Sequence, residues 1–310
     1  MTVLIAGSSG LVGSALTKVF QDSGEEVVGI NTKVVNLLDL GKLITFMHKV
    51  KPTLVIDAAA KVGGIGINDA LPVEFLADNL RIQLNLMEAA YLAKVNNFIF
   101  LGSSCIYPRN SEQPIKEEYL MTGPLESSNS AYAVAKIAGL ELVNSYRKEF
   151  GLNWITLMPS NLYGPNDNFN LDTSHVLPAM IRRFVEAVEE TVPSVTLWGS
   201  GSPRREFLHV DDMARAVLIA SKSYSSSLHL NIGSGEDLTI KELAQKVARI
   251  SGYKGEIKWD HTKPDGTPRK LLDVSRIQEL NWRPEISLDE GIFSTIEWYR
   301  NANKIGGIRK

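Results

Sequence analysis

"TVLIAGSSGLVGSAL", residues 2–16, joins a short apolar run to an amphipathic segment through three glycines. Gly7, Gly10 and Gly13 have the spacing GxxGxxG. Glycine permits a sharp turn, and it lets backbone N–H groups approach a pyrophosphate at the positive end of a helix. The stretch therefore predicts the first strand, phosphate-binding turn and helix of a dinucleotide-binding βαβ unit.

Short apolar runs alternate with helical patterns along the first half of the chain. Strands are predicted at "TVLIAG", "EEVVGI", "PTLVIDAA", "NNFIFLGS" and "NWITLMPS", and helices at residues 11–22, 40–50, 74–94 and 131–150. Runs that are apolar on both faces are typical of a parallel sheet covered by helices on each side. The predicted fold class is α/β, with a Rossmann-type doubly wound parallel sheet.

The sequence changes character after Asn161, where "YGPNDNFNLDTSH" is rich in Asn, Asp, Gly and Pro. We expect a smaller, discontinuous α/β lobe that binds substrate. The predicted limits are residues 1–164 and 206–232 for the nucleotide domain, and 165–205 and 233–310 for the substrate domain. "EFLHVDDMARAVLIASKS", residues 206–223, is expected to return to the sheet and continue as a helix capped by an aspartate.

Composition narrows the function classes. The 310 residues carry a net charge of −2, which does not favour binding to nucleic acid or to an anionic membrane. No apolar run approaches the roughly 20 residues that span a bilayer. A single cysteine cannot form an internal disulfide, so a cytoplasmic location is expected. Neither a Cys/His cluster nor paired carboxylates at ligand spacing indicate a metal site.

Two side chains in "SAYAVAKIAG" have the pattern of a proton-transfer pair. Tyr132 and Lys136 lie four residues apart, on one face of a predicted helix. A nearby ammonium is expected to lower the pKa of the phenol, which can then give a proton to a carbonyl oxygen. Ser103, at the carboxyl end of a predicted strand, is expected to face the same site.

The end of the second predicted strand bears on cofactor choice. NAD-binding folds place an acidic residue there to accept the ribose hydroxyls. "GINTKVVNLLD" offers Asn31, Thr32 and Lys33 instead. Lys33 could pair with a 2′-phosphate, so NADP (NADPH) is predicted rather than NAD. The alternative is that Lys33 is an ordinary surface lysine.

The glycine loop, "GSS" and the YxxxK pair together resemble the extended short-chain dehydrogenase/reductase family. "GSGSPRREFLHVDD" resembles the sugar-nucleotide branch of that family. Finer segments are similar to members of the branch that act on GDP-4-keto-6-deoxy-D-mannose: "AAAKVGGI", "GSSCIYP", "MPSNLYGPNDNF", "SHVLPAMIRRF" and "KPDGTPRKLLD". Some relatives carry an arginine near the glycine loop or after the second strand, whereas this chain has Ser8, Ser9 and Asn31.

The resemblance implies a bifunctional epimerase-reductase that forms GDP-L-fucose. It inverts C3 and C5 of the 4-keto sugar, and NADPH then reduces C4. Ser103, Tyr132 and Lys136 would be the reductase triad, with Cys105 the base and His175 the acid of epimerisation. Strand alternation would put Ser103 and Cys105 on the same side, if the extended backbone continues that far.

The resemblance also implies binding residues and a homodimer paired through the helices at 74–94 and 131–150. The predicted cofactor contacts are Gly7, Ser8, Ser9, Gly10, Leu11, Val12, Gly13, Lys33, Asn36, Leu37, Leu101, Gly102, Ser103, Ser104, Tyr132, Lys136, Pro159, Ser160, Asn161, Leu162 and His175. The predicted contacts to the GDP-sugar substrate are Arg183, Trp198, Arg205 and Asp265.

Other interpretations stay open from sequence alone. Cys105 could be a small core residue, His175 a surface or capping residue, Arg183 part of a solvated helix face, and Asp265 a turn-forming residue. The alternative functions are a sugar-nucleotide 4-epimerase, a 4,6-dehydratase and a non-catalytic NADP-sensing regulator. The thiol disfavours the first two, and the intact Ser103, Tyr132 and Lys136 disfavour the third.

Overall fold

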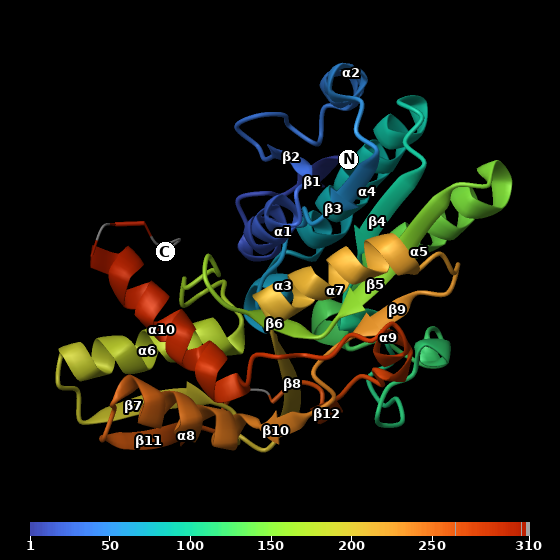
Figure 1. Ribbon diagram of the computed structural model, residues 1–310. Helices are drawn as coiled ribbons and strands as arrows, with labels where there is room; N and C mark the ends of the chain where they lie inside the picture. Colours follow the sequence, from blue (N-terminus) through green and yellow to red (C-terminus); the bar gives the residue numbers. More distant parts are fainter. Residues whose placement is uncertain (264, 305, 308–310) are drawn as a thin grey trace.

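The computed structural model describes residues 1–263, 265–304 and 306–307. Its largest element is a six-stranded parallel sheet in the order β2-β1-β3-β4-β5-β9 (Figure 1). The strands are β1 (Thr2–Ala6), β2 (Glu26–Ile30), β3 (Leu54–Asp57), β4 (Asn97–Leu101), β5 (Asn153–Pro159) and β9 (Leu230–Ile232). The strand order reverses beside β1, which makes the carboxyl ends of β1 and β3 the expected ligand-binding edge. The predicted doubly wound fold is confirmed.

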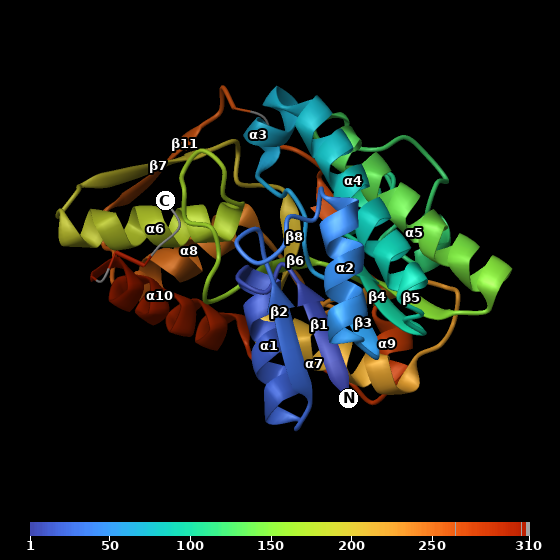
Figure 2. The ribbon, with the colours of Figure 1, turned by 90° about the horizontal axis from the view of Figure 1, so that it is seen from above.

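Helices cover both faces of this sheet (Figures 1 and 2). They are α1 (Leu11–Asp22) and α7 (Val210–Ser223) on one face, and α2 (Leu40–Val50), α4 (Pro72–Leu92) and α5 (Ser130–Phe150) on the other. Val3 and Ile5 of β1 pack in the core on the side of α1 and α7, whereas Leu4 and Ala6 pack in the core on the side of α2, α4 and α5. Each strand therefore buries both faces, which explains its continuous apolar sequence.

The predicted helix limits agree closely with the structure. α1 and α2 have the predicted bounds, and α4 and α5 begin and end within two residues of them. Asp39 caps α2 by accepting from the backbone N–H of Lys42, and Gly151 ends α5 in the left-handed region at φ 69°. These are the cap residues that the pattern favours at the two ends of a helix.

A separate apolar core lies beside the central sheet, in the lower part of Figure 1. Its helices are α6 (Val176–Glu189), α8 (Ile240–Ser251) and α10 (Leu288–Lys304), and its parallel strand pair is β7 (Ser194–Trp198) with β11 (Glu256–Asp260). Phe184, Leu243 and Ile292 are fully buried there. The limits of the two lobes at residues 164, 206 and 232 stay a prediction.

A small sheet connects the two regions. β8 (Arg204–His209) pairs with β6 (Asn161–Tyr163), β10 (Asp237–Thr239) and β12 (Arg269–Lys270). The prediction that the strand at the start of residues 206–223 returns to the central sheet is wrong, because β9 occupies that edge. Phe207 packs in the smaller core and Leu208 in the larger one. An apolar strand buried on both sides does not reveal which sheet it joins.

The cap of α7 also differs from the prediction. The Nδ1 of His209 accepts a hydrogen bond from the backbone N–H of Asp211 at 3.3 Å, so the cap is a histidine. Burial lowers the pKa of His209 and favours the neutral ring, whose nitrogen can accept. Asp212 instead accepts from the backbone N–H groups of Glu285 and Ile286.

The remaining short elements are α3 (Ile65–Ala70), α9 (Ser275–Glu279) and the 3₁₀ turns Ser104–Ile106, Glu117–Tyr119 and Ser127–Asn129. Within the described part of the chain, every helix is too short or too polar to cross a lipid bilayer.

Candidate active site

The glycine loop forms a tight cradle between β1 and α1. Gly7 has φ 78°, and a Cβ atom at this position would lie 2.7 Å from the carbonyl oxygen of Ala58. A Cβ atom at Gly13 would lie 2.1 Å from the carbonyl oxygen of Gly7. Backbone N–H groups at the start of α1 are therefore approachable by an anion, and the loop fits a dinucleotide pyrophosphate.

We expect Gly13→Ala to weaken dinucleotide binding by about tenfold or more, because the added methyl group must displace the Gly7 backbone. Fluorescence titration with NADPH measures this change. Gly66→Ala, in α3, is the matched control because a Cβ atom there would meet no other atom within 4 Å. Equal affinities of the two variants would contradict a phosphate-binding role for the loop.

Beyond β2, Lys33 and Asn36 are exposed, whereas the Leu37 side chain is buried in the core below α2. Leu37 can therefore offer a cofactor only its backbone. A hollow of about 500 Å³ opens beside these residues. Its lining is Thr32, Val34, Val35, Asn36, Gly41, Lys42, Thr45, Phe46 and Lys49.

The carboxyl end of β4 carries the serine and the cysteine. β4 ends at Leu101, and Ser103 begins the 3₁₀ turn that contains Ser104 and Cys105. The expected strand alternation therefore does not reach Cys105. Ser103 and Cys105 are adjacent for another reason, since Ser103 Oγ accepts from the backbone N–H of Cys105 at 3.3 Å. Gly102 lets this segment pack tightly, because its Cβ atom would overlap the sulfur of Met158.

Helix α5 brings Tyr132 and Lys136 to the same strand end. Lys136 is only 3% exposed, and its Nζ donates to the carbonyl oxygen of Leu101 at 2.8 Å. That nitrogen lies 5.9 Å from the centre of the Tyr132 ring. Phe75 packs edge-on against Tyr132 with 6.5 Å between ring centres. Ser103, Cys105, Tyr132 and Lys136 are thus gathered around the end of β4.

The expected lowering of the Tyr132 pKa is wrong. Burial raises the pKa of Tyr132 well above its usual value, and the negative charges of Cys105 and Asp57 add to the rise. A side-chain contact with Ser103 opposes it. Desolvation is the largest cause, because a buried phenolate loses its hydration and the contact with Ser103 returns only part of that loss. The phenol is therefore held in its protonated form.

Two polar groups face Cys105. Asn129 Nδ2 donates to the Cys105 sulfur at 3.3 Å, a hydrogen bond that orients the side chain of Cys105. Arg205 of β8 interacts electrostatically with Cys105, Glu126 and Asp265. Cys105 is half-buried rather than enclosed in the core, and it is the one cysteine in the chain. This environment differs from that of an inert core thiol.

His175 is the residue that precedes α6, and its side chain makes no capping hydrogen bond. The residue is exposed, yet surrounding protein atoms desolvate the imidazole and lower the pKa of His175. Among described residues, none hydrogen-bonds to its ring. The neighbouring backbone at Thr173 accepts from Gly64 N at 3.0 Å, which joins this segment to the loop after β3.

The predicted substrate residues lie in different settings. Trp198 is 57% exposed, with Lys263 Nζ 5.2 Å from its ring centre. Both oxygens of Asp265 accept from Ser200, so Asp265 shapes the turn after Trp198. Arg183 is partly buried, and its guanidinium forms no hydrogen bond or ion pair with other described residues. Its neighbour Arg182 instead donates to Glu186 at 2.9 Å and to the carbonyl oxygen of Phe169.

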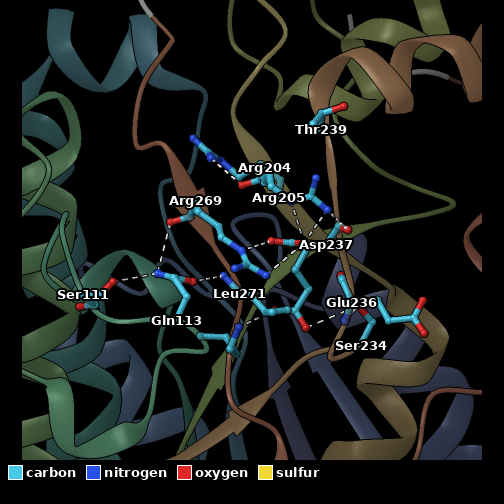
Figure 3. Close-up of polar contacts among 12 residues, drawn as sticks. Ser111, Gln113, Arg204, Arg205, Ser234, Glu236, Asp237, Thr239, Arg269 and Leu271 are labelled. Atoms are coloured by element: carbon cyan, nitrogen blue, oxygen red, sulfur yellow. Dashed lines mark hydrogen bonds and ion pairs between the residues drawn. The ribbon is translucent and has the colours of Figure 1, made fainter.

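Ion pairs around β8 fix the strand that carries Arg205. Arg204 and Arg269 both donate to Asp237, and Gln113 bridges Ser111, Arg269 and Leu271 (Figure 3). Glu206 accepts from the backbone of Gly235 at 2.7 Å and of Leu272 at 3.1 Å. Arg205 itself donates to the carbonyl oxygen of Arg204, at 2.8 Å. The framework leaves much of the Arg205 guanidinium available for a ligand.

The remaining predicted cofactor residues follow the strand ends. Leu11 and Val12 begin α1, and Ser8 Oγ donates to the carbonyl oxygen of Ile30. Pro159, Ser160, Asn161 and Leu162 run from the end of β5 into β6. Ser160 N donates to the carbonyl oxygen of Ile232, which links this segment to β9. All these segments therefore border the same edge of the central sheet.

Sequence reasoning missed Asp57 and Asn129. Asp57 is 1% exposed at the end of β3, and one of its oxygens has no hydrogen-bond partner among the described residues. Its signal was a lone carboxylate ending the apolar run "TLVID". Asn129 lies in a polar loop, where no sequence pattern distinguishes an amide that contacts a thiol from one that contacts water.

Comparisons with known proteins agree with this geometry. Residues 3–233 match the model of the NAD dependent epimerase/dehydratase family. The chain is 46% identical to GDP-L-fucose synthase of Escherichia coli (strain K12), with 98% of each chain covered. It is 49% identical to putative GDP-L-fucose synthase 2 of Arabidopsis thaliana, covering 96% of this chain and 91% of that protein.

Solved structures give the same picture. A GDP-L-fucose synthetase from Naegleria fowleri bound to NADP aligns with a TM-score of 0.90 and 28% identity. The alignment covers 100% of this chain and 96% of that one. The similarity therefore extends over both cores and includes the site at the end of β4.

Proposed function

This chain belongs to the NAD dependent epimerase/dehydratase family, and we propose that it converts GDP-4-keto-6-deoxy-D-mannose to GDP-L-fucose. The observation that carries the proposal is the position of Cys105. Its turn also holds Ser103, and both residues lie beside Tyr132 and Lys136. One strand end thus offers a base for epimerisation and a proton donor for reduction. The names of the relatives support the GDP-linked 4-keto sugar as substrate.

Epimerisation uses the acidity of hydrogens next to a ketone. The C3 and C5 protons are both α to C4, so the Cys105 thiolate can remove each one as negative charge spreads to the C4 oxygen. His175 then returns a proton on the opposite face. The lowered pKa of His175 means that the ring must first gain a proton, and the nearby diphosphate of a bound nucleotide-sugar would favour that charge.

Reduction uses Ser103, Tyr132 and Lys136. When bound, a nicotinamide cofactor would supply hydride to C4. Tyr132 is the residue that gives its proton to the C4 oxygen. Ser103 orients the carbonyl oxygen, and the Lys136 ammonium stabilises the phenolate that remains. Glycine-loop N–H groups would bind the pyrophosphate, and Lys33 and Asn36 are the proposed contacts to the adenosine end.

NADPH is the proposed cofactor. β2 ends without a carboxylate to accept ribose hydroxyls, and Lys33 is exposed just beyond it. A lysine suits a 2′-phosphate, whereas an aspartate or glutamate would repel it. The NADP-bound structure from Naegleria fowleri supports the same choice.

Arg183, Arg205 and Trp198 are the proposed contacts to the nucleotide-sugar. A guanidinium binds a diphosphate through charge-assisted hydrogen bonds, and an exposed indole can stack on a base or pack on a sugar. Asp265 is proposed to act mainly by shaping the loop after Trp198, since Ser200 occupies its carboxylate.

A second copy of the chain is proposed to cover α4 and α5. These helices pack side by side at the outside of the molecule (Figures 1 and 2). Val73, Leu84, Leu92, Val134 and Phe150 are exposed along them. Burial of such apolar side chains between two copies would stabilise a homodimer.

The test is a turnover assay with GDP-4-keto-6-deoxy-D-mannose and either NADPH or NADH. We expect consumption of the nicotinamide at 340 nm with a preference for NADPH, and GDP-L-fucose as the product by NMR. Reduction without inversion at C3 and C5 would reject the epimerase half. The absence of turnover with both cofactors would reject the proposal entirely.

A further inference from the structure

A buried carboxylate lies next to the reductase residues and has no assigned role. Asp57 is the last residue of β3, and it pairs in register with Ala6 of β1 and Phe100 of β4. Its Oδ1 accepts from the backbone N–H of Ala59 at 3.1 Å, but its Oδ2 has no partner among the described residues. Burying a carboxylate oxygen without a partner lowers the stability of the fold. We therefore expect a positive charge nearby to compensate.

Lys136, on helix α5, supplies that charge. Its Nζ lies 4.6 Å from the centre of the Phe100 ring, and Phe100 is the strand neighbour of Asp57. An ammonium has three N–H donors, and the Leu101 carbonyl takes one. Both groups are therefore buried around the same aromatic ring, in the layer between the central sheet and the helices α4 and α5.

Few charged side chains surround the Phe100 ring. β1 contributes Ala6, β5 contributes Thr156, and α4 contributes the uncharged Gln83, which donates to Ala135. The titratable groups facing one another are Asp57, Lys136 and Tyr132, with Cys105 beyond Tyr132. Burial raises the pKa of Asp57 to about 6, and the charge of Lys136 limits that rise. Burial lowers the pKa of Lys136, and the charge of Asp57 opposes that fall.

We propose that Asp57 is the counter-ion of Lys136 and positions the charged ammonium for the reduction step. Asp57 is enclosed by protein, so we assign it a role through Lys136, as a positioning residue. Its relevance to catalysis rests on the proposed reductase function. Its electrostatic effect on Lys136 does not, because that effect exists in the free protein.

The sign of the effect follows from the charges. Above about pH 6 Asp57 is ionised and favours the protonated form of Lys136. Without Asp57, Lys136 loses its proton at lower pH, and Tyr132 also loses a negative neighbour that keeps it protonated. Because of both changes, reductase activity should begin to fall at a lower pH, closer to neutrality, than in the wild type.

The direct test is an NMR titration of protein labelled with ¹³C at lysine Cε, with the Lys136 resonance assigned from Lys136→Arg. We expect Asp57→Asn to lower the titration midpoint of Lys136 by about half a pH unit or more. Thr156→Val is the matched control. Thr156 is the other strand neighbour of Phe100, is also buried, and has an unpartnered hydroxyl but no charge. The titration midpoint of Lys136 in Thr156→Val should equal its midpoint in the wild type.

The second measurement is the pH profile of hydride transfer under saturating substrate. We expect the ratio of the rates at pH 9 and pH 7 to fall about threefold or more in Asp57→Asn, and not in Thr156→Val. Asp57→Leu, which suits the apolar surroundings, replaces Asp57→Asn if that variant folds poorly. An unshifted Lys136 midpoint overturns the inference. A shifted midpoint in a protein without turnover rejects the proposed function and leaves the counter-ion pair supported.

Discussion

Tyr132→Phe is expected to lower the rate of hydride transfer to C4 by about 100- to 10,000-fold, the range that is typical when a positioned proton donor is removed. Binding of NADPH is expected to stay unchanged, because phenylalanine keeps the ring and its edge-on contact with Phe75. Stopped-flow absorbance at 340 nm measures the step directly.

The reason lies in the protonation state of the phenol. Burial and the charges of Cys105 and Asp57 raise the pKa of Tyr132, so the group holds its proton throughout the neutral range. Such a phenol donates only when negative charge develops on the C4 oxygen close by. Lys136 and Ser103 then stabilise the phenolate, and phenylalanine offers no proton for them to assist.

Tyr146→Phe is the matched control, because it makes the same substitution later on the same helix. Tyr146 packs against Tyr91, Phe150 and Trp154, and its ring contacts do not need the hydroxyl. This variant should reduce C4 at the wild-type rate. Hydride transfer of equal speed in both variants would remove Tyr132 from the reaction.

The central sheet could be predicted because its signals are local. β1, α1 and α2 follow from apolar runs, periodicity and cap residues within single segments. Partner choice between sheets is not local, which is why β8 was expected in the wrong sheet. Phe207 and Leu208 face different cores, and their order along the chain gives no hint of this.

The same distinction between local sequence signals and non-local contacts applies to the candidate site. Glycine spacing, the YxxxK pair and the serine after β4 are sequence patterns, and the structure brings their residues together. The 3₁₀ turn at Cys105 is set by a hydrogen bond between Ser103 and the backbone, which strand alternation does not anticipate. The effects of Asp57 on Lys136 and of Asn129 on Cys105 depend on burial and tertiary contact, and no short motif encodes either.

Cys105→Ser is expected to lower solvent deuterium incorporation at C3 and C5 by about 100-fold or more. Thiols ionise near pH 8.5, within reach of neutrality, whereas a serine hydroxyl stays protonated in the same position. The substitution preserves size and keeps an oxygen that can accept from Asn129. NMR of substrate incubated in deuterated buffer, without reductant, reads out the exchange.

The chain provides its own control for the thiol. It contains one cysteine, so alkylation by iodoacetamide should label one residue per wild-type chain and none in the variant. Bound substrate should protect that thiol if it faces the sugar. Normal deuterium exchange in Cys105→Ser would return Cys105 to a packing role and leave the base unassigned.

Tyr132→Phe and Cys105→Ser together separate the two half-reactions. Tyr132→Phe should exchange deuterium at C3 and C5 but reduce slowly, because the thiol and His175 are untouched. Cys105→Ser should bind NADPH and keep the proton donor for C4, so any product that it forms retains the original configuration at C3 and C5. Loss of both activities in either variant would show that the thiol and the phenol act in one step, against the separate roles that their positions around the end of β4 indicate.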